Sequence, residues 1–594
     1  MAKLLNRNEV LEKEKWDLKR IYESEAQYEK DLKEALEQAT KLEKYQGKIK
    51  TEEDILDILE KYEELKIKID HLSHYVDLDY SVDMGDEKRK TRSMNFLKID
   101  SEISQKTAYI ENEIADVDDK ILDKIINAEN RYSDYIKDIK RRKPHLLDPK
   151  TKDLVEKFSY VLSAPYRLYL EMKLSDMNFE DFELSGKKYE NSFVLYENHY
   201  QYQIDTDLRR KAFKYFSKAL SHYKNTFASV YDTYLQAEKT IAKLKGFDSL
   251  KEYHLFIQDV DEDLYNRQLD VIMEELSKHM RKYVKILKKL YKLDEVRFSD
   301  MKLPIEIIKG ESYKFEDSKP IVKKALQVMG DDYLKIAMSS FDNRWVDYAL
   351  NRGKSTGGFC ASPYKKDGFI LMSWTGGLDD LYTLVHEIGH GVHFHFAQAE
   401  NSYFSQEPSL YIIEAPSTMN EVLLSKALLQ EEKDDKKRAQ IVAAMISNTY
   451  YHNFVTHFLE AYYQREVYKL VDSDQAITEP VLSKLFKETL QKFFGDELVI
   501  DEGAELTWMR QPHYYSGLYS YTYSAGLTIG TLMANKIYEN KDSYKDWIEV
   551  LKLGGKKNVV EMAKTAGINI KDDKALRECI DFVGDMIDLI DKAI

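Results

Sequence analysis

Residues that break helices are scarce along this chain. Its 594 residues include 23 glycines and 10 prolines, and Gly47 and Gly85 are the only glycines before Gly186. Because glycine and proline are the residues that most often interrupt helices, long helices can run through most of the sequence. The chain is therefore expected to be mainly α-helical.

An amphipathic pattern fills the segment from Thr51 to Tyr80. Apolar residues recur there at spacings of three and four, at Ile55, Ile58, Leu59, Tyr62, Leu65, Ile69, Leu72 and Val76. This spacing predicts a helix packed against neighbours, and Thr51 with Asp54 resembles a capping box at its start. We expect an N-terminal helical domain over residues 1–185 and a second domain over residues 186–594, which contains the motifs described below.

The composition argues against several classes of protein. Hydrophobic residues make up 43% of the chain, enough for a sizeable core, and the net charge of −15 argues against nucleic acid as the main partner. The two cysteines, Cys360 and Cys579, form no disulfide framework and fit a reducing compartment. The chain shows neither a secretory signal nor a long apolar run, so we expect a cytoplasmic protein that does not bind membranes.

Between residues 342 and 380 the helical pattern gives way to signals for a loop, a strand and a turn. A glycine-rich loop spans Arg352 to Phe359, and Phe369 to Trp374 is expected to form a strand. A glycine turn follows, and Asp379 and Asp380 are placed where carboxylates favour the start of a helix. Function is found more often in such an island than in uniform helical bundle.

The sharpest motif is His386-Glu387-Ile388-Gly389-His390. Helical residues four apart lie on one face, so the two imidazoles can bind one tetrahedral Zn²⁺. Glu387 points to the neighbouring side, where it can act as a general base on a zinc-bound water. A separate apolar stripe serves the core face of this helix: Leu381, Leu384, Val385, Ile388 and Val392. The histidines are therefore not needed as core residues.

A catalytic zinc site also needs a third protein ligand and an open position for water. Glu414 precedes a second helical pattern and can reach back as that ligand. Glu421, two turns further on, is either an acceptor for the free N–H of a zinc histidine or a surface charge. His393 is one turn beyond the motif, which favours a packing or supporting role over direct binding of the metal.

A tyrosine-rich segment at residues 510–523 offers neutral hydrogen-bond donors. It contains His513 together with Tyr515, Tyr519 and Tyr523. Hydrolysis of an amide at zinc builds negative charge on the carbonyl oxygen, which a tyrosine O–H or a histidine N–H can stabilise. The segment is either such a donor loop, able to close over a cleft, or a tyrosine-rich packing loop.

Together these motifs resemble peptidase family M3, and its oligoendopeptidase F members in particular. The resemblance spans nearly the whole chain. Its segments are Trp16-Asp17-Leu18, Arg352 to Phe359 with the following strand and glycine turn, His386 to His393, Glu414 to Ser417 with Glu421, and Pro512 to Tyr523.

The resemblance implies an architecture. Members are mostly helical, with two helical walls around a deep channel and a small β-sheet beside the HExxH helix. The edge strand of that sheet, here Phe369–Trp374, would pair with an extended peptide substrate. The channel would admit oligopeptides and exclude folded proteins.

The resemblance also implies roles for individual residues. His386, His390 and Glu414 would bind one Zn²⁺ per chain, Glu387 would activate water, and His513 with a tyrosine would stabilise the oxyanion. Some relatives place more residues before the first active tyrosine than this chain does. The choice of tyrosine therefore stays open among Tyr515, Tyr519 and Tyr523.

The function expected from the sequence is a zinc-dependent metalloendopeptidase that hydrolyses short oligopeptides, with a monomer favoured. One alternative is a zinc protein without turnover, such as a peptide-binding scaffold, although the presence of Glu387 counts against it. Another is a helical interaction protein with structural histidines, which would purify without stoichiometric zinc.

Overall fold

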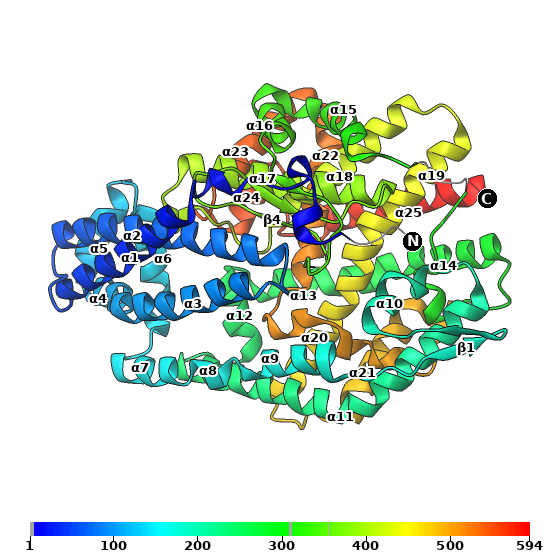
Figure 1. The fold of residues 1–594 in the computed structure, drawn as a ribbon, viewed down its shortest axis with the longest axis horizontal. Coiled ribbons are helices and arrows are strands. Elements are labelled where there is room, and N and C mark those ends of the chain that lie inside the picture. Colours follow the sequence, from blue (N-terminus) through cyan, green and yellow to red (C-terminus); the bar gives the residue numbers. More distant parts are fainter. Residues whose placement is uncertain (1–4, 308–311, 356) are drawn as a thin grey trace. The chain divides into compact units, whose positions relative to one another are not determined.

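The computed structural model describes residues 5–307, 312–355 and 357–594, and it is mainly α-helical with two small sheets in this part of the chain (Figure 1). The predicted fold class is thus confirmed. The chain forms two compact units, each assembled from three stretches. The first unit is Met1–Pro149, Gly310–Ala427 and Met533–Ile568, and the second is Lys150–Lys309, Leu428–Leu532 and Asn569–Ile594. The division into domains at residue 185 stays a prediction.

Six helices open the first unit. They are α1 (Glu25–Leu42), α2 (Glu52–Ser81), α3 (Glu87–Thr107), α4 (Tyr109–Asp116), α5 (Asp119–Asn127) and α6 (Ser133–Arg142). The predicted capping box is present, because Thr51 Oγ1 accepts from the Asp54 N–H and the Asp54 carboxylate accepts from the Thr51 N–H. The apolar face of α2 packs against α1 and α3, as its periodicity predicts.

The three-stranded sheet of the first unit has the order β3-β5-β4, with β3 at Val346–Asp347, β4 at Phe359–Ala361 and β5 at Phe369–Leu371. The predicted strand therefore exists, but it is shorter than Phe369–Trp374. The prediction that it is an edge strand is wrong, because β5 pairs with β3 on one side and with β4 on the other. All three β5 residues are fully buried, which is typical of a strand covered on both faces and flanked by neighbours.

Helix α17 (Leu378–Glu400) follows this sheet and packs against β4 and β5. As predicted, acidic residues lie in its first turn. The Asp380 carboxylate accepts from the backbone N–H groups of Thr375, Gly376 and Gly377, at 2.7, 2.6 and 3.2 Å. This fixes the glycine turn between the sheet and the helix. The predicted apolar stripe of α17 is fully buried.

The rest of the first unit is helical. It contains α15 (Phe315–Leu326), α16 (Gly330–Asp342), α23 (Tyr544–Lys552), α24 (Val559–Thr565) and the start of α18 (Ala415–Glu431). Both α16 and α23 pack against α17, so the helix that carries the HExxH motif is covered on several sides.

The second unit is built mainly from long helices. They include α11 (Thr206–Leu244), α12 (Leu250–Gln258), α13 (Glu262–Val271), α14 (Ser277–Tyr291), α19 (Asp435–Met445), α20 (His457–Asp472), α21 (Glu479–Phe494) and α25 (Lys574–Ala593). A two-stranded hairpin pairs β1 (Phe182–Leu184) with β2 (Lys187–Tyr189). In the described part of the chain, no helix is both long enough and apolar enough to span a bilayer.

Two segments of the second unit depart from regular α-helix. A π-helical segment, Ile446–Thr456, runs directly into α20; such wide turns are frequent at functional sites. The tyrosine-rich segment is only partly a loop, since it contains the 3-10 turn Pro512–Tyr515 and ends in α22 (Tyr521–Glu539).

Candidate active site

A close contact between α17 and α18 sets the geometry of the site in the first unit. A Cβ atom on Gly389 would lie 2.6 Å from the Ser417 Cα atom, so only glycine fits at this crossing. The Asn420 side chain donates to the Val385 carbonyl oxygen at 3.0 Å and ties the helices together. The histidine face of α17 is thereby brought to the N-terminus of α18, next to Glu414.

His386, His390 and Glu414, which we call the first-unit triad, come together as the sequence predicts. Their ligand atoms all lie within 4.8 Å of one another. The Glu414 Oε2 atom is 3.3 Å from His386 Nε2 and 3.5 Å from His390 Nε2. Donors at about 2.0–2.1 Å around a tetrahedral ion lie about 3.3 Å apart, so these separations fit an ion the size of Zn²⁺.

Two further side chains orient the members of this triad. His386 Nδ1 donates to Glu421 Oε1 at 2.6 Å, which leaves Nε2 facing Glu414. Glu421 is buried, so of the two alternatives the hydrogen-bond acceptor holds and the surface charge does not. The Ser417 hydroxyl lies 3.3 Å from Glu414 Oε2 and can donate to it.

The charges of the first-unit triad stabilise one another. Burial lowers the pKa of His386, but its hydrogen bonds to Glu414 and Glu421 raise it well above the ordinary value. Burial raises the pKa of Glu414, but His390 and His386 hold it well below the ordinary value. Glu414 is therefore ionised, which is the form that binds a metal.

Glu387 is in a different electrostatic environment from Glu414. Burial raises the pKa of Glu387, although His386 and His390 act in the opposite direction. Within the described ranges its carboxylate has no hydrogen-bond partner. A buried carboxylate with a raised pKa and a free oxygen is suited to accept a proton.

The edge strand β4 passes close to Glu387. A Cβ atom on Gly358, the residue before β4, would lie 3.3 Å from Glu387 Oε1 and 3.0 Å from Thr383 Cγ2. The glycine at this position thus lets the strand approach the carboxylate. Strand β4 is thus the edge strand that packs against the HExxH helix, whereas the sequence predicts β5 for this role.

The environment of His393 fits a packing residue better than a metal ligand. It is almost fully buried, and neither ring nitrogen has a hydrogen-bond partner among the described residues. Burial lowers the pKa of His393 to about 3, so the imidazole is neutral. The packing role favoured by its position in the sequence agrees with this environment.

A second group of two histidines and a glutamate lies in the second unit. Glu460 Oε2 accepts from His457 Nδ1 at 3.0 Å and from His513 Nδ1 at 3.1 Å, and we call these three residues the second-unit triad. Ser520 Oγ donates to the same oxygen at 3.0 Å, and His457 Nε2 lies 3.0 Å from His452 Nε2. Of these residues, only His513 is among the candidates that the sequence predicts. The His457–Glu460 spacing of three on a helix was the available signal.

Glu460 is the charged centre of this network. It is only 2% exposed, and burial alone would raise its pKa. The neighbouring His457 and His513 outweigh burial and hold the pKa of Glu460 well below the ordinary value. The ionised carboxylate therefore fixes the N–H of His513 on Nδ1 and directs Nε2 away from Glu460.

The three candidate tyrosines separate into two groups. Tyr519 and Tyr523 lie beside His513, each with ring centroids 5.7 Å from it, and Tyr523 stacks on His457 at 4.0 Å. Tyr515 packs in another aromatic cluster, where its neighbours are Tyr169, Tyr231 and Tyr234. Tyr515 is buried within this cluster, and its burial raises the pKa of its hydroxyl group. The structure thus brings Tyr519 and Tyr523, but not Tyr515, to His513.

Comparison with known proteins gives consistent matches along the chain. The sequence model of peptidase family M3 matches residues 199–582, and that of oligopeptidase F matches residues 113–179. Oligopeptidase PepF of Bacillus subtilis is 26% identical over 600 residues, which cover 100% of this chain and 89% of that protein.

Solved structures share the fold. A Chlamydophila abortus protein of known crystal structure superposes with a TM-score of 0.85 at 21% identity and covers 100% of both chains. Oligoendopeptidase-F from Enterococcus faecium superposes with a TM-score of 0.75 at 20% identity, covering 95% of this chain and 98% of that one. Since the family M3 model spans well over half of the sequence, the chain belongs to peptidase family M3 and is a metalloendopeptidase.

Proposed function

We propose that the protein hydrolyses short oligopeptides with one Zn²⁺ bound by His386, His390 and Glu414. The main support is the donor set: two imidazole nitrogens and a carboxylate oxygen, with Nε2–Oε2 separations of 3.3 and 3.5 Å. Three protein ligands leave the fourth position of a tetrahedral ion open to solvent. A bound Zn²⁺ supplies Lewis acidity and lowers the pKa of water in that position towards about 7.

Glu387 is the proposed general base. It directly follows a ligand histidine, its carboxylate is free of hydrogen bonds in the described structure, and burial raises its pKa. Glu387 takes a proton from the attacking water and then gives a proton to the leaving amine. A raised pKa helps both halves of this exchange, because the carboxylate must accept and release a proton at the same pH.

His513, Tyr519 and Tyr523 are the proposed donors to the oxyanion. Their support is mutual contact in the second unit and the anchoring of His513 Nδ1 by Glu460. The same geometry favours a packing role for Tyr515. Neutral O–H donors and an oriented imidazole suit a developing negative charge.

Extended peptides are the proposed substrates, and β4 is the proposed strand that pairs with them. It is an edge strand, and Gly358 brings it next to Glu387. Relatives named oligopeptidase and oligoendopeptidase F support short peptides as the substrate class. Exclusion of folded proteins follows if only an extended chain can add to this edge.

The test is cleavage of an internally quenched oligopeptide, with and without a chelator, by the parent and by Glu387→Gln. We expect the chelator to abolish cleavage and Glu387→Gln to lower kcat by about 10²–10⁴-fold while zinc content stays at one per chain. Glu400→Gln, at an exposed position at the end of the same helix, is the matched control and should behave as the parent. Parental activity in Glu387→Gln would disprove the assignment of the base, and zinc without any cleavage would favour a binding scaffold.

A further inference from the structure

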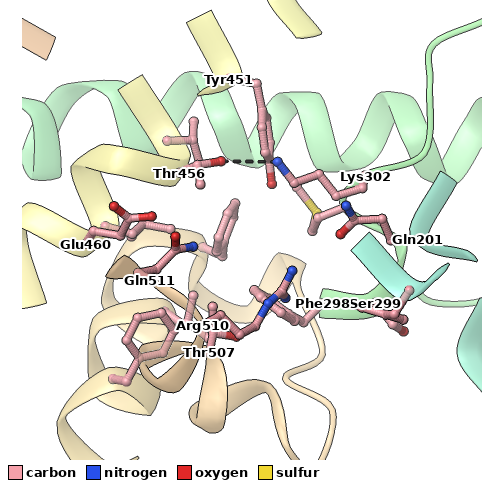
Figure 2. Close-up of a pocket in the computed structure, with 17 residues that line it drawn as sticks. Gln201, Phe298, Ser299, Lys302, Tyr451, Thr456, Glu460, Thr507, Arg510 and Gln511 are labelled. Carbon is pink, nitrogen blue, oxygen red and sulfur yellow. Dashed lines mark hydrogen bonds between the residues drawn. The ribbon is translucent and has the colours of Figure 1, made fainter. Parts of the chain in front are cut away.

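A cavity of about 80 Å³ lies within the second unit and has both charged and apolar walls (Figure 2). One water needs about 10–15 Å³ measured in this way, so the space exceeds what a single solvent molecule requires. Aromatic and aliphatic side chains form much of the wall, among them Phe298, Tyr451 and Leu459. Such a lining is typical of a ligand pocket in which a few polar groups fix the orientation.

Lys302 brings a positive charge to this cavity, whose wall also holds the carboxylate of Glu460. Its Nζ atom lies 3.3 Å from Thr456 Oγ1, to which it donates, and 5.0 Å from the ring centroid of Tyr451. Among the described residues it forms no ion pair with any carboxylate. Burial lowers the pKa of Lys302 to about 8. A desolvated ammonium group without a direct ion-pair partner contributes little to the stability of a fold, so a role in binding a ligand would explain its position.

Arg510 adds a second cationic group to the same wall. Its Nε and Nη2 atoms pair with Glu197 Oε1 at 3.0 and 2.9 Å. Its Nη1 atom has no partner in the described structure and is available to a ligand. The fixed guanidinium is thus held in place on one side and offers a donor on the other.

Glu460 lines the cavity from another direction. Figure 2 shows Glu460 at the left of the view, Lys302 at the upper right and Arg510 below them. The Oε2 atom of Glu460 accepts from His457 and His513, whereas its Oε1 atom is buried and has no partner among the described residues. An anion in the cavity is therefore repelled by Glu460 and attracted towards Lys302 and Arg510. A backbone N–H of the same ligand could satisfy Glu460 Oε1.

The cavity shares one wall residue, Glu460, with the network that anchors His513. Gln511, which also belongs to the wall, is two residues before His513. A ligand in the cavity would therefore lie against the carboxylate that anchors His513.

We propose that the cavity is a subsite for a carboxylate group of a bound peptide, held by Lys302 and Arg510. The inference rests on the proposed function, because it takes the ligand to be the peptide substrate or its product. The carboxylate comes either from the C-terminus of the peptide or from an aspartate or glutamate side chain. The apolar wall then covers the remainder of that residue.

Calorimetry with four peptides tests the subsite and separates the two sources. N-acetyl-Ala-Phe-Leu is compared with its C-terminal amide, and N-acetyl-Ala-Glu-Leu amide with N-acetyl-Ala-Gln-Leu amide. All measurements use zinc-loaded protein in the Glu387→Gln background, which prevents turnover. We expect at least one acidic peptide to bind about tenfold or more tightly than its amide partner. The pair that differs identifies the source of the carboxylate.

Lys302→Met should abolish that preference while leaving amide binding unchanged. Lys484→Met is the matched control, because Lys484 has a side chain 76% exposed on α21 and its replacement removes the same charge. A charge retained for binding rather than for stability predicts that Lys302→Met melts at the same or a higher temperature than its parent. Lys302→Gln provides a second variant if methionine does not fold.

Three results would overturn the subsite: equal affinity for acid and amide in both pairs, an acid preference that survives in Lys302→Met or Lys302→Gln, or loss of the preference in Lys484→Met. Absence of binding by all four peptides would overturn it too. Cleavage of the quenched oligopeptide is measured separately, so the subsite and peptide hydrolysis can fail independently of each other.

Discussion

The first-unit triad and the second-unit triad contain the same three side chains, two histidines and a glutamate, in different geometry. In the first, the histidines present Nε2 to the carboxylate at 3.3 and 3.5 Å. In the second, they present Nδ1 at 3.0 and 3.1 Å. The longer separations match the edge of a tetrahedron around Zn²⁺, while the shorter ones match N–H···O hydrogen bonds.

The difference shows that residue types alone do not define a metal site. In the first-unit triad, Glu421 accepts a hydrogen bond from His386 Nδ1, so that His386 Nε2 is available to bind an ion. In the second-unit triad, Glu460 itself accepts hydrogen bonds from the Nδ1 atoms of His457 and His513. The Ser520 hydroxyl is a third donor to the same oxygen. The Glu460 carboxylate is thus already satisfied on one oxygen by protein donors. We therefore expect the first triad to bind metal and the second to orient His513.

The largest expected effect is on zinc content, and it tests directly whether the two triads differ in binding metal. Glu414→Gln should lower zinc from one ion per chain to nearly none and abolish peptidase activity, because a neutral amide replaces an ionised ligand. Glu460→Gln should keep the full zinc content. Metal analysis by mass spectrometry of both purified variants checks this. Two ions per parent chain, or loss of zinc in Glu460→Gln, would show that the second-unit triad binds metal as well.

The next effect concerns the same Glu460→Gln variant with zinc bound. The amide can no longer accept strongly from two imidazoles and a hydroxyl, so His513 loses its fixed orientation. Loss of one oxyanion donor costs about 10²–10³-fold in kcat, and we expect about 10²-fold with little change in KM.

Glu466→Gln, elsewhere on α20, is the control for this experiment, because Glu466 pairs with Arg465 and Lys469 and not with the second-unit triad. A rise in KM with unchanged kcat would place His513 in substrate binding instead of oxyanion stabilisation.

The sequence predicts helices and strands better than it predicts how they meet. The α2 helix with its Thr51 cap, and α17 with its buried stripe, follow from local periodicity and from hydrogen bonds within a few residues. The order of the strands depends on contacts between distant segments, so a buried apolar run such as β5 indicates a strand without indicating its neighbours.

The same limit applies to the candidate site. The spacing of His386 and His390 on one helix specifies their shared face, so this pair is predictable. Glu460 and His513 lie on different elements, and their hydrogen bond depends on the fold of the whole second unit. The separation of Tyr515 from Tyr519 is set by the 3-10 turn and the loop after it, whose path has no periodic signal in the sequence.

A smaller effect sharpens the assignment of Glu421. Glu421→Gln keeps an acceptor for His386 Nδ1 but removes the negative charge beside it. Partners of this kind typically contribute 10–100-fold to metal affinity, and we expect the lower end, about tenfold weaker zinc binding. Competition with a chromogenic chelator measures this. Unchanged affinity would mean that Glu421 holds the helices together without influencing the metal.

The smallest expected effect tests why the first-unit triad forms at all. Its members come from two helices, so their separation depends on how closely α17 and α18 approach. In Gly389→Ala the new Cβ would meet the backbone of Ser417, at 2.6 Å from Cα. Overpacking of this kind costs about 1–3 kcal/mol, and the better helix propensity of alanine offsets up to about 1 kcal/mol of that.

Gly391→Ala on the same helix is the control, because its Cβ would meet only side chains, the nearest being Trp345 Cζ3 at 3.0 Å. We expect a net loss of about 1–2 kcal/mol in unfolding free energy for Gly389→Ala and a smaller change for Gly391→Ala, measured by denaturant unfolding of the metal-free protein. Zinc affinity should fall only in Gly389→Ala, since displacement of α18 moves Glu414 away from both histidines. In the second-unit triad, His457 and Glu460 lie on one helix, so their separation does not depend on the approach of two helices. Equal effects of the two substitutions would therefore locate the metal geometry in α17 alone and not in its contact with α18.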